Sequence, residues 1–129
     1  MARKVAGVNE ASSKLRTCIA TVSIAGDFRE KLAAISRAGF TGIEIFEQDF
    51  LAYDGRAVDV GWLVQDYGLE IMLFQPFRDF EGLPEPYRSR AFERAERKFD
   101  LMNSMDANLV LVCSNLSAHA LGGIDRAAD

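Results

Sequence analysis

The sequence predicts an α/β fold: the N-terminal half of a (β/α)8 TIM barrel, with about four parallel strands and covering helices. From Thr17 onward, short apolar runs alternate with amphipathic stretches. The runs are nearly continuous in Ile, Val, Leu and Phe, which is typical of strands buried on both faces of a parallel sheet. Each strand–helix unit takes roughly 25 to 40 residues, which suits one of the eight units of such a barrel.

The chain is predicted to hold one partial barrel domain, residues 17–129, after a flexible N-terminal extension, residues 1–16. The extension has no long apolar stretch, so we do not interpret it as a secretory signal. No segment approaches the ~20 apolar residues of a membrane span. The composition is 49% hydrophobic and 26% charged with a net charge of -4, which argues against disorder and gives no electrostatic reason to expect a nucleic-acid partner. We expect a cytoplasmic protein with no membrane partner.

Four apolar runs are the expected strands. In chain order they are Thr17–Val22, Gly42–Phe46, Glu70–Gln75 and Leu109–Cys113. The first and last contain Cys18 and Cys113, which we interpret as free, buried thiols of a reducing compartment. A metal site would need closely spaced Cys or His partners, and the sequence lacks them.

The first helix is predicted between Asp27 and Gly39. Asp27 followed by Glu30 is the pattern of a capping box, in which a side-chain oxygen accepts from a free amide of the first turn. Gly39 supplies the left-handed residue that ends the helix. Its apolar positions recur at helical spacing: Phe28, Leu32, Ile35 and Ala38.

The second helix is predicted from Ala57 to about Tyr67, with Gly68 as its end. Val60, Val64 and Tyr67 form the inner stripe. Gly61 weakens this helix by up to ~1 kcal/mol relative to alanine.

The third helix has Pro84 and Pro86 near its start, where the missing amide costs nothing. Its apolar face is predicted to be Tyr87, Ala91, Ala95, Phe99 and Met102. The other face carries alternating charges, which are typical of a solvent-exposed surface: Arg88, Arg90, Glu93, Arg94, Arg97 and Lys98. A fourth helix is predicted to begin near Asp125. The same alternation would fit a doubly wound sheet, but no G-x-G-x-x-G follows the first strand, which disfavours nucleotide binding.

Candidate site residues follow the strands, because function in such barrels gathers at the carboxyl ends of strands. Side chains alternate along a strand, so Glu44 points into the barrel if Ile43 and Ile45 face the helices. A buried carboxylate is costly unless it is paired or bound to a ligand or metal. A structural ion pair with an interior Arg or Lys is the alternative.

After the third strand, Phe77 and Phe80 flank Arg78 as two exposed loop aromatics. An arginine framed by apolar rings keeps its charge and offers two parallel donors to a carboxylate or phosphate. The alternative is a loop salt bridge between Arg78 and Asp79.

After the fourth strand, the hydroxyl of Ser114 and the amide of Asn115 are able to bond a polyhydroxylated ligand. Ser and Asn also favour strand-to-loop turns, so a purely structural role is equally open. His119 is the single histidine of the chain. It is a candidate base, although a lone loop histidine is more often simply exposed.

Several of these segments resemble a known family. GIEIF and the preceding Phe40-Thr41 are similar to the second strand of the xylose-isomerase-like barrels, also called the sugar phosphate isomerase/epimerase superfamily. The longer runs AGDFREKL, LFQPFRDFEGLPEP, RAFERAERKFDLM and LVLVCSN resemble the bacterial 3-dehydroshikimate dehydratases, some of which are fused to a dioxygenase-like domain. The resemblance covers nearly everything from Thr17 onward.

This resemblance implies a carbon–oxygen lyase that uses a divalent metal (Mg, Mn or Co) to dehydrate 3-dehydroshikimate to protocatechuate, in the degradation of quinate and shikimate. In such enzymes the metal stabilises an enolate while a basic side chain takes the adjacent proton. It implies substrate-binding roles for Arg78, Gln75, Glu44, Ser114 and Asn115. The family's metal ligands and catalytic base come from later strands, so no catalytic residue or metal ligand is expected in this chain.

Three hypotheses therefore remain. The intact protein is this dehydratase, or it is a sugar-phosphate or hydroxy-acid isomerase or epimerase of the same superfamily. The third is that the 129 residues alone are a non-catalytic fragment, and a small ligand-binding module is the remaining option. Four strands cannot close an eight-stranded barrel, so exposed sheet edges would favour self-association and no metal would be bound.

Overall fold

The structure is a computed structural model, and it describes residues 15–123 and 125. Four strands form one sheet in the order β1-β2-β3-β4, and every neighbouring pair is parallel. The strands are β1 (Cys18–Ala20), β2 (Gly42–Phe46), β3 (Glu70–Phe77) and β4 (Val110–Val112). A doubly wound sheet reverses its strand order part of the way across, whereas a barrel adds each strand beside the previous one. The consecutive order confirms the predicted partial barrel.

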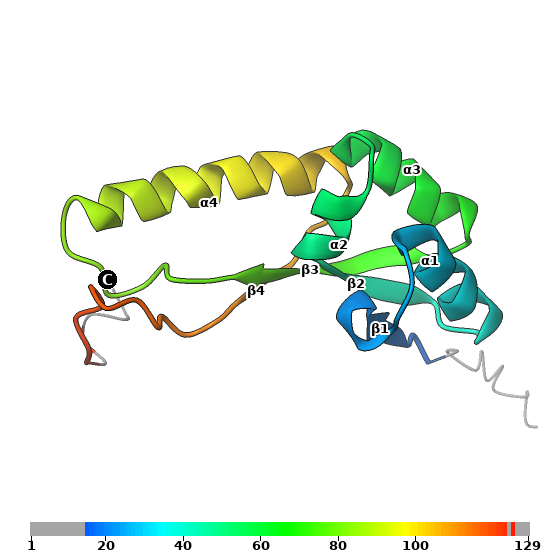
Figure 1. The fold of residues 1–129 in the computed structure, drawn as a ribbon, viewed down its shortest axis with the longest axis horizontal. Coiled ribbons are helices and arrows are strands. Elements are labelled where there is room, and N and C mark those ends of the chain that lie inside the picture. The colour runs from blue at the N-terminus through cyan, green and yellow to red at the C-terminus, as the bar shows by residue number, and fades with distance from the viewer. Residues whose placement is uncertain (1–14, 124, 126–129) are drawn as a thin grey trace, which may run out of the picture.

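The helices cover one face of the sheet, with α4 lying along it above β3 and β4 (Figure 1). They are α1 (Phe28–Arg37), α2 (Glu47–Ala52), α3 (Ala57–Asp66) and α4 (Tyr87–Ser104). The main apolar core lies between these helices and the sheet. It joins Leu32 and Ile35 of α1 and Val60 of α3 to Ile45 and Phe74 of the strands, all with at most 1% exposure.

α1 begins and ends as its sequence predicts. The Asp27 carboxylate accepts from the Glu30 amide at 2.9 Å, and the Glu30 carboxylate accepts from the Asp27 amide at 2.9 Å. Gly39, with φ of +84°, follows its last turn. Gly68 has φ of +69° and ends α3 in the same manner.

α2 was not predicted. Its six residues contain no fully buried side chain, so no apolar stripe marks it in the sequence. Glu47 and Asp49 in its first turn stabilise the positive end of the helix dipole. Glu47, directly after β2, is therefore the first residue of a helix.

Several predictions about apolar residues are wrong. Ala38, predicted on the apolar face of α1, is exposed, and the thiols of Cys18 and Cys113 are only partly buried. Phe99 was assigned to the buried face of α4, but it is 47% exposed, because it lies toward Leu109 and Val110 at the outer strand β4, beside which no further strand is described. Phe77 was taken as an exposed loop aromatic, but β3 extends to include it and it is 4% exposed. The inner positions Ala91, Ala95 and Met102 are buried as predicted.

β1 is shorter than the predicted run, because the chain enters a single 3-10 turn, η1 (Thr21–Ser23). Thr21 is completely buried, and its hydroxyl accepts from the Phe46 amide at 3.0 Å. Val22, which had been placed in the strand, is 51% exposed. The buried hydroxyl fixes the turn against the carboxyl end of β2.

Some predictions fall outside the described residues. These are nearly all of the N-terminal extension and most of the helix expected from Asp125. Within the described residues, no helix is long and apolar enough to cross a membrane.

Candidate functional site

The helix-free face of the sheet carries a polar group of three side chains, which we call the inner-face cluster: Cys18 of β1, Glu44 of β2 and Gln75 of β3. Ile43 and Ile45 are completely buried toward the helices, so strand alternation places Glu44 on the other face, as predicted. The Gln75 amide nitrogen donates to Glu44 Oε2 at 2.9 Å. The Cys18 thiol donates to Glu44 Oε1 at 3.8 Å. Three adjacent strands thus meet at one carboxylate.

The neutral partners of Glu44 differ from the structural ion pair that was considered for it. Across residues 15–123 and 125, no Lys or Arg forms a salt bridge with Glu44. Partial burial of Cys18, together with the charge and the hydrogen bond of Glu44, raises the pKa of its thiol. Cys18 therefore stays protonated at neutral pH and acts as a donor, not as a nucleophile.

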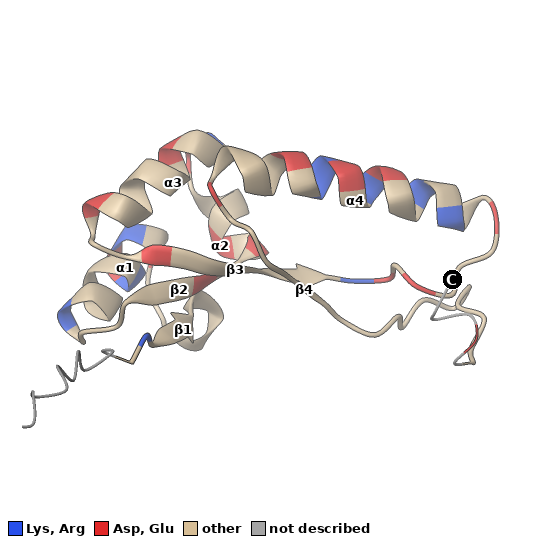
Figure 2. Cartoon of the chain, turned by 180° about the vertical axis from the view of Figure 1, so that it is seen from behind, with Lys and Arg blue, Asp and Glu red and all other residues tan. Residues whose placement is uncertain are grey.

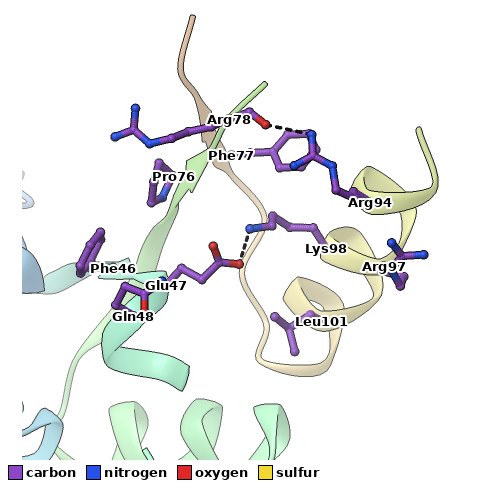
Figure 3. A pocket seen from close by; sticks show the side chains of 10 residues that line it. All are labelled: Phe46, Glu47, Gln48, Pro76, Phe77, Arg78, Arg94, Arg97, Lys98 and Leu101. Carbon is purple, nitrogen blue, oxygen red and sulfur yellow. Dashed lines mark hydrogen bonds and ion pairs between the residues drawn. The ribbon is translucent and has the colours of Figure 1, made fainter. Parts of the chain in front are cut away.

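A cavity of about 540 Å³ lies between α4 and the carboxyl ends of β2 and β3. We call it the rim cavity; its ten lining residues are drawn in Figure 3. Its apolar wall is made by Phe46, Pro76, Phe77 and Leu101. Arg78, Arg94, Arg97 and Lys98 supply positive charge, and Glu47 supplies the single carboxylate.

Lys98 reaches from α4 across the cavity to Glu47 at the start of α2, and the two form an ion pair (Figure 3). The Lys98 side chain is 11% exposed, and its ammonium lies 5.3 Å from the centre of the Phe74 ring and 5.4 Å from that of Phe77. Aromatic faces attract a cation, so the ammonium is held in place on two sides.

Arg94 is also fixed. Its guanidinium lies 5.3 Å from the centre of the Phe77 ring and donates to the backbone carbonyls of Arg78 at 3.0 Å and Asp79 at 2.5 Å. Charges alternate along α4 (Figure 2), and its charged face was predicted to be solvent-exposed throughout. For Lys98 this prediction is wrong, because its side chain is largely buried. The aromatic residues at the end of β3 draw these two cations toward the sheet.

Arg78 lines the rim cavity and is exposed at the end of β3. In the described part of the chain its guanidinium forms no salt bridge, so the proposed pair with Asp79 is not present. Asp79 instead accepts from the Leu116 amide at 3.0 Å. The donors of Arg78 are left available to a ligand.

The loops after β3 and β4 are joined to each other. The Asn115 side chain donates to the Glu81 carbonyl at 2.6 Å, and its oxygen accepts from the Ser117 amide at 2.8 Å. The Leu121 amide donates to the Gly82 carbonyl at 2.8 Å. The Asn115 amide is thus used by the loop itself, and its predicted role toward a substrate stays a prediction.

Ser114 is exposed and precedes this joined pair of loops. His119 lies stacked on Tyr87, with ring centres 3.9 Å apart and planes at 14°. The histidine therefore links the second loop to the start of α4.

Glu47, Arg94 and Lys98 were not predicted as members of a site. Arg94 and Lys98 are four residues apart, so they share one helix face. That spacing was visible, but the sequence does not show that this face lies over aromatic residues of β3. Among residues 15–123 and 125, no group of three or more His, Cys, Asp or Glu side chains is placed to hold a metal ion.

Comparison with known proteins finds a family model and several proteins that are similar to this chain. The sequence profile described as "Xylose isomerase-like TIM barrel" matches residues 32–129. A 3-dehydroshikimate dehydratase of Pseudomonas aeruginosa is 59% identical over 108 residues, which are 84% of this chain and 17% of that protein. A 3-dehydroshikimate dehydratase of Pseudomonas putida is 53% identical over the same shares of each protein. The chain thus spans less than a fifth of the length of these curated relatives.

Two solved structures are also similar. A xylose isomerase-like TIM barrel/4-hydroxyphenylpyruvate dioxygenase fusion protein is 52% identical with a TM-score of 0.83, over 87% of this chain and 18% of that one. A xylose isomerase domain protein of Salmonella typhimurium is 17% identical with a TM-score of 0.60, over 75% of this chain and 36% of that one. The second likeness concerns the fold alone.

Proposed function

Because the chain belongs to the xylose isomerase-like TIM barrel family, we propose that it is the N-terminal part of a 3-dehydroshikimate dehydratase, a lyase that forms protocatechuate. The observation that carries this proposal is its identity of 59% and 53% to two dehydratases of that name. No specific observation favours the isomerase or epimerase alternative, since the Salmonella likeness extends to the fold only.

The proposed substrate is a cyclic carboxylate with hydroxyl groups. Arg78 is proposed to pair with the substrate carboxylate, because its two parallel donors match a carboxylate and no described carboxylate occupies them. Glu44 and Gln75 are proposed to bond substrate hydroxyls from the helix-free face, since their mutual hydrogen bond orients both groups. Ser114 is proposed as a further contact, and Asn115 as the residue that holds its loop.

A divalent cation (Mg²⁺, Mn²⁺ or Co²⁺) is part of the proposal for the intact enzyme, where it would stabilise an enolate. None of the described residues is proposed as its ligand, because they form no suitable group. The catalytic base is likewise proposed to lie outside this chain, so the 129 residues alone are expected to be inactive. A reducing, cytoplasmic setting is compatible with the free thiols Cys18 and Cys113.

A chimaera tests the proposal. Residues 17–123 of this chain replace the corresponding segment of the Pseudomonas aeruginosa dehydratase, and protocatechuate formation from 3-dehydroshikimate is measured with added Mg²⁺, Mn²⁺ or Co²⁺. We expect product formation within about tenfold of the parent enzyme, since the cores are closely related. A correctly folded chimaera that forms no protocatechuate would overturn the proposal. The 129-residue chain serves as the inactive control.

A further inference from the structure

The rim cavity has the features of a binding site that the proposed substrate contacts do not use. Neither Glu44 nor Gln75 lines it, and Arg78 is the one lining residue that the proposed function employs. Its volume of about 540 Å³ lies in the range of small-molecule sites, ~300 to 1,000 Å³. We propose that the rim cavity binds a small ring carboxylate, with Arg97 of α4 and Arg78 after β3 holding the carboxylate and the apolar wall holding the ring.

The charges of the lining residues indicate that the ligand is an anion. Four cations and one carboxylate line the cavity, and that carboxylate, Glu47, is already paired with Lys98. Arg94 is engaged by backbone carbonyls. Arg78 and Arg97 form no salt bridge with any described carboxylate. The cavity therefore carries uncompensated positive charge, which attracts an anion.

The apolar wall indicates that the rest of the ligand is an apolar ring. Phe46 and Pro76 lie on one side of the cavity, and Leu101 and the buried Phe77 ring lie toward α4 (Figure 3). An inorganic anion would leave this surface in contact with water, whereas a flat ring would cover it. Apolar walls also strengthen the attraction between the cations and a carboxylate, because they exclude water. A ring that carries one carboxylate would therefore match both the positive charge and the apolar wall of the cavity.

The site is held in shape before any ligand binds. Lys98 joins α4 to α2 through Glu47, and Arg94 joins α4 to the end of β3. Both cations also lie over the Phe77 ring. The ordering of these side chains therefore does not have to accompany binding, which favours affinity.

Titration of the 129-residue chain tests the proposal without any turnover. Benzoate binding is measured by calorimetry and by amide chemical shifts, with benzyl alcohol as the neutral ring and inorganic phosphate as the anion without a ring. We expect benzoate to bind more tightly than either, to shift amides of α4 and of β3 near Phe77, and to weaken as ionic strength rises. Equal binding of benzyl alcohol or of phosphate would overturn the proposal.

Substitutions locate the site. Arg97→Gln and Arg78→Gln are each expected to weaken benzoate binding about tenfold, because each removes a charge-assisted donor. Arg90→Gln is the matched control, since Arg90 is an exposed cation of α4 that does not line the cavity. If the control weakens binding as much as Arg97→Gln, the attraction is that of the whole helix and the proposal fails. Circular dichroism confirms that each variant keeps its fold.

A comparison of two carboxylates identifies the source of the ligand. Binding of protocatechuate more tightly than benzoate would point to the product of the proposed reaction, and equal binding would point to ring carboxylates in general. Both results support the ring-carboxylate class. An inactive chimaera together with benzoate binding would sink the proposed function and leave this inference standing, so the two failures are distinguishable.

Discussion

At the scale of single residues, Glu44 is the group on which the inner face depends. It accepts one hydrogen bond from β1 and one from β3, both from neutral donors. Because no described cation is paired with it, its charge is available to whatever lies over this face of the sheet. Together with the partial burial of Cys18, which is the larger cause, this charge raises the pKa of the Cys18 thiol.

Glu44→Gln is expected to lower the pKa of Cys18 toward its ordinary value. Partial burial and the neighbouring Glu44 raise the pKa of the Cys18 thiol above its ordinary value, so the thiolate is scarce at pH about 8 and its fraction grows as pH rises. Removal of the neighbouring charge eliminates one cause of that shift, so alkylation of Cys18 by iodoacetamide at pH about 8 becomes faster. Cys113 is the internal reference. An unchanged or slower rate for Cys18 relative to Cys113 would contradict this electrostatic account.

The position of Glu44 could be predicted from the sequence, but its hydrogen-bond partner could not. Alternation along β2 was enough to place Glu44 on the helix-free face, because Ile43 and Ile45 require burial on the other. Its partner Gln75 was expected on the same rim, but the hydrogen bond between them depends on the register of β2 with β3. Register is a tertiary quantity, and a single sequence does not display it.

At the scale of elements, a buried ion pair joins α1 to α2. Lys31 donates to Asp49 at 2.7 Å, and their side chains are only 8% and 16% exposed. The second Asp49 oxygen is buried without a partner in the described part of the chain. Neither this pair nor α2 was predicted, because each depends on contact between segments that have no shared pattern in the sequence.

Lys31→Met is expected to destabilise the fold by about 3 to 5 kcal/mol, because it leaves the Asp49 charge buried and unpaired. Adding Asp49→Leu is expected to recover most of that loss. Urea unfolding measures the free energy of each variant, with Arg37→Met at an exposed position of α1 as the control. If Lys31→Met alone changes the free energy of unfolding by less than about 1 kcal/mol, the description of this pair as buried and coupled is wrong.

Gly61→Ala is expected to destabilise α3, although alanine is the better helix former. A Cβ at this position would lie 3.0 Å from the Met105 carbonyl oxygen, which belongs to the backbone after α4. The resulting strain of about 1 to 3 kcal/mol exceeds the helix gain of at most ~1 kcal/mol. The difference between Gln65→Gly and Gln65→Ala, at an exposed site of α3, reports the glycine-to-alanine helix gain alone. If thermal unfolding shows Gly61→Ala to be the more stable protein, the close approach of α3 to Met105 is wrong.

The helices show the same division between pattern and contact. The capping box of α1 and the terminating Gly39 and Gly68 are local features, and the sequence predicted all of them. The exposure of Phe99 and the burial of Lys98 depend on what lies opposite each face of α4, so helical periodicity alone assigned both wrongly.

At the scale of the whole molecule, the strand order decides the architecture. The four parallel strands have helices on one face only, and the other face is uncovered in the described part of the chain. The outer edges of β1 and β4 pair with no further described strand. The side chains of Leu109, Leu111 and Val112 at β4 are exposed. Unpaired strands with apolar side chains favour association with another chain.

We therefore expect the 129-residue chain to self-associate in a concentration-dependent way. Light scattering after size-exclusion chromatography measures the mass, and Leu111→Lys is expected to shift the population toward monomer, because a charge on an edge strand opposes pairing. Leu51→Lys, at an exposed position of α2, which packs on α1, β2 and β3, is the control. A sharply unfolding monomer at all concentrations would contradict the expectation.

We propose that this sheet presents Glu44 and Arg78 to the substrate of a 3-dehydroshikimate dehydratase. The most direct test is kcat/KM for 3-dehydroshikimate in the chimaera that carries residues 17–123, with Glu44→Gln, Arg78→Gln or the control Arg90→Gln. We predict that the first two each lower kcat/KM at least about tenfold, as the loss of a charged contact requires, and that Arg90→Gln leaves it unchanged. Unchanged kcat/KM in both Glu44→Gln and Arg78→Gln would contradict the account.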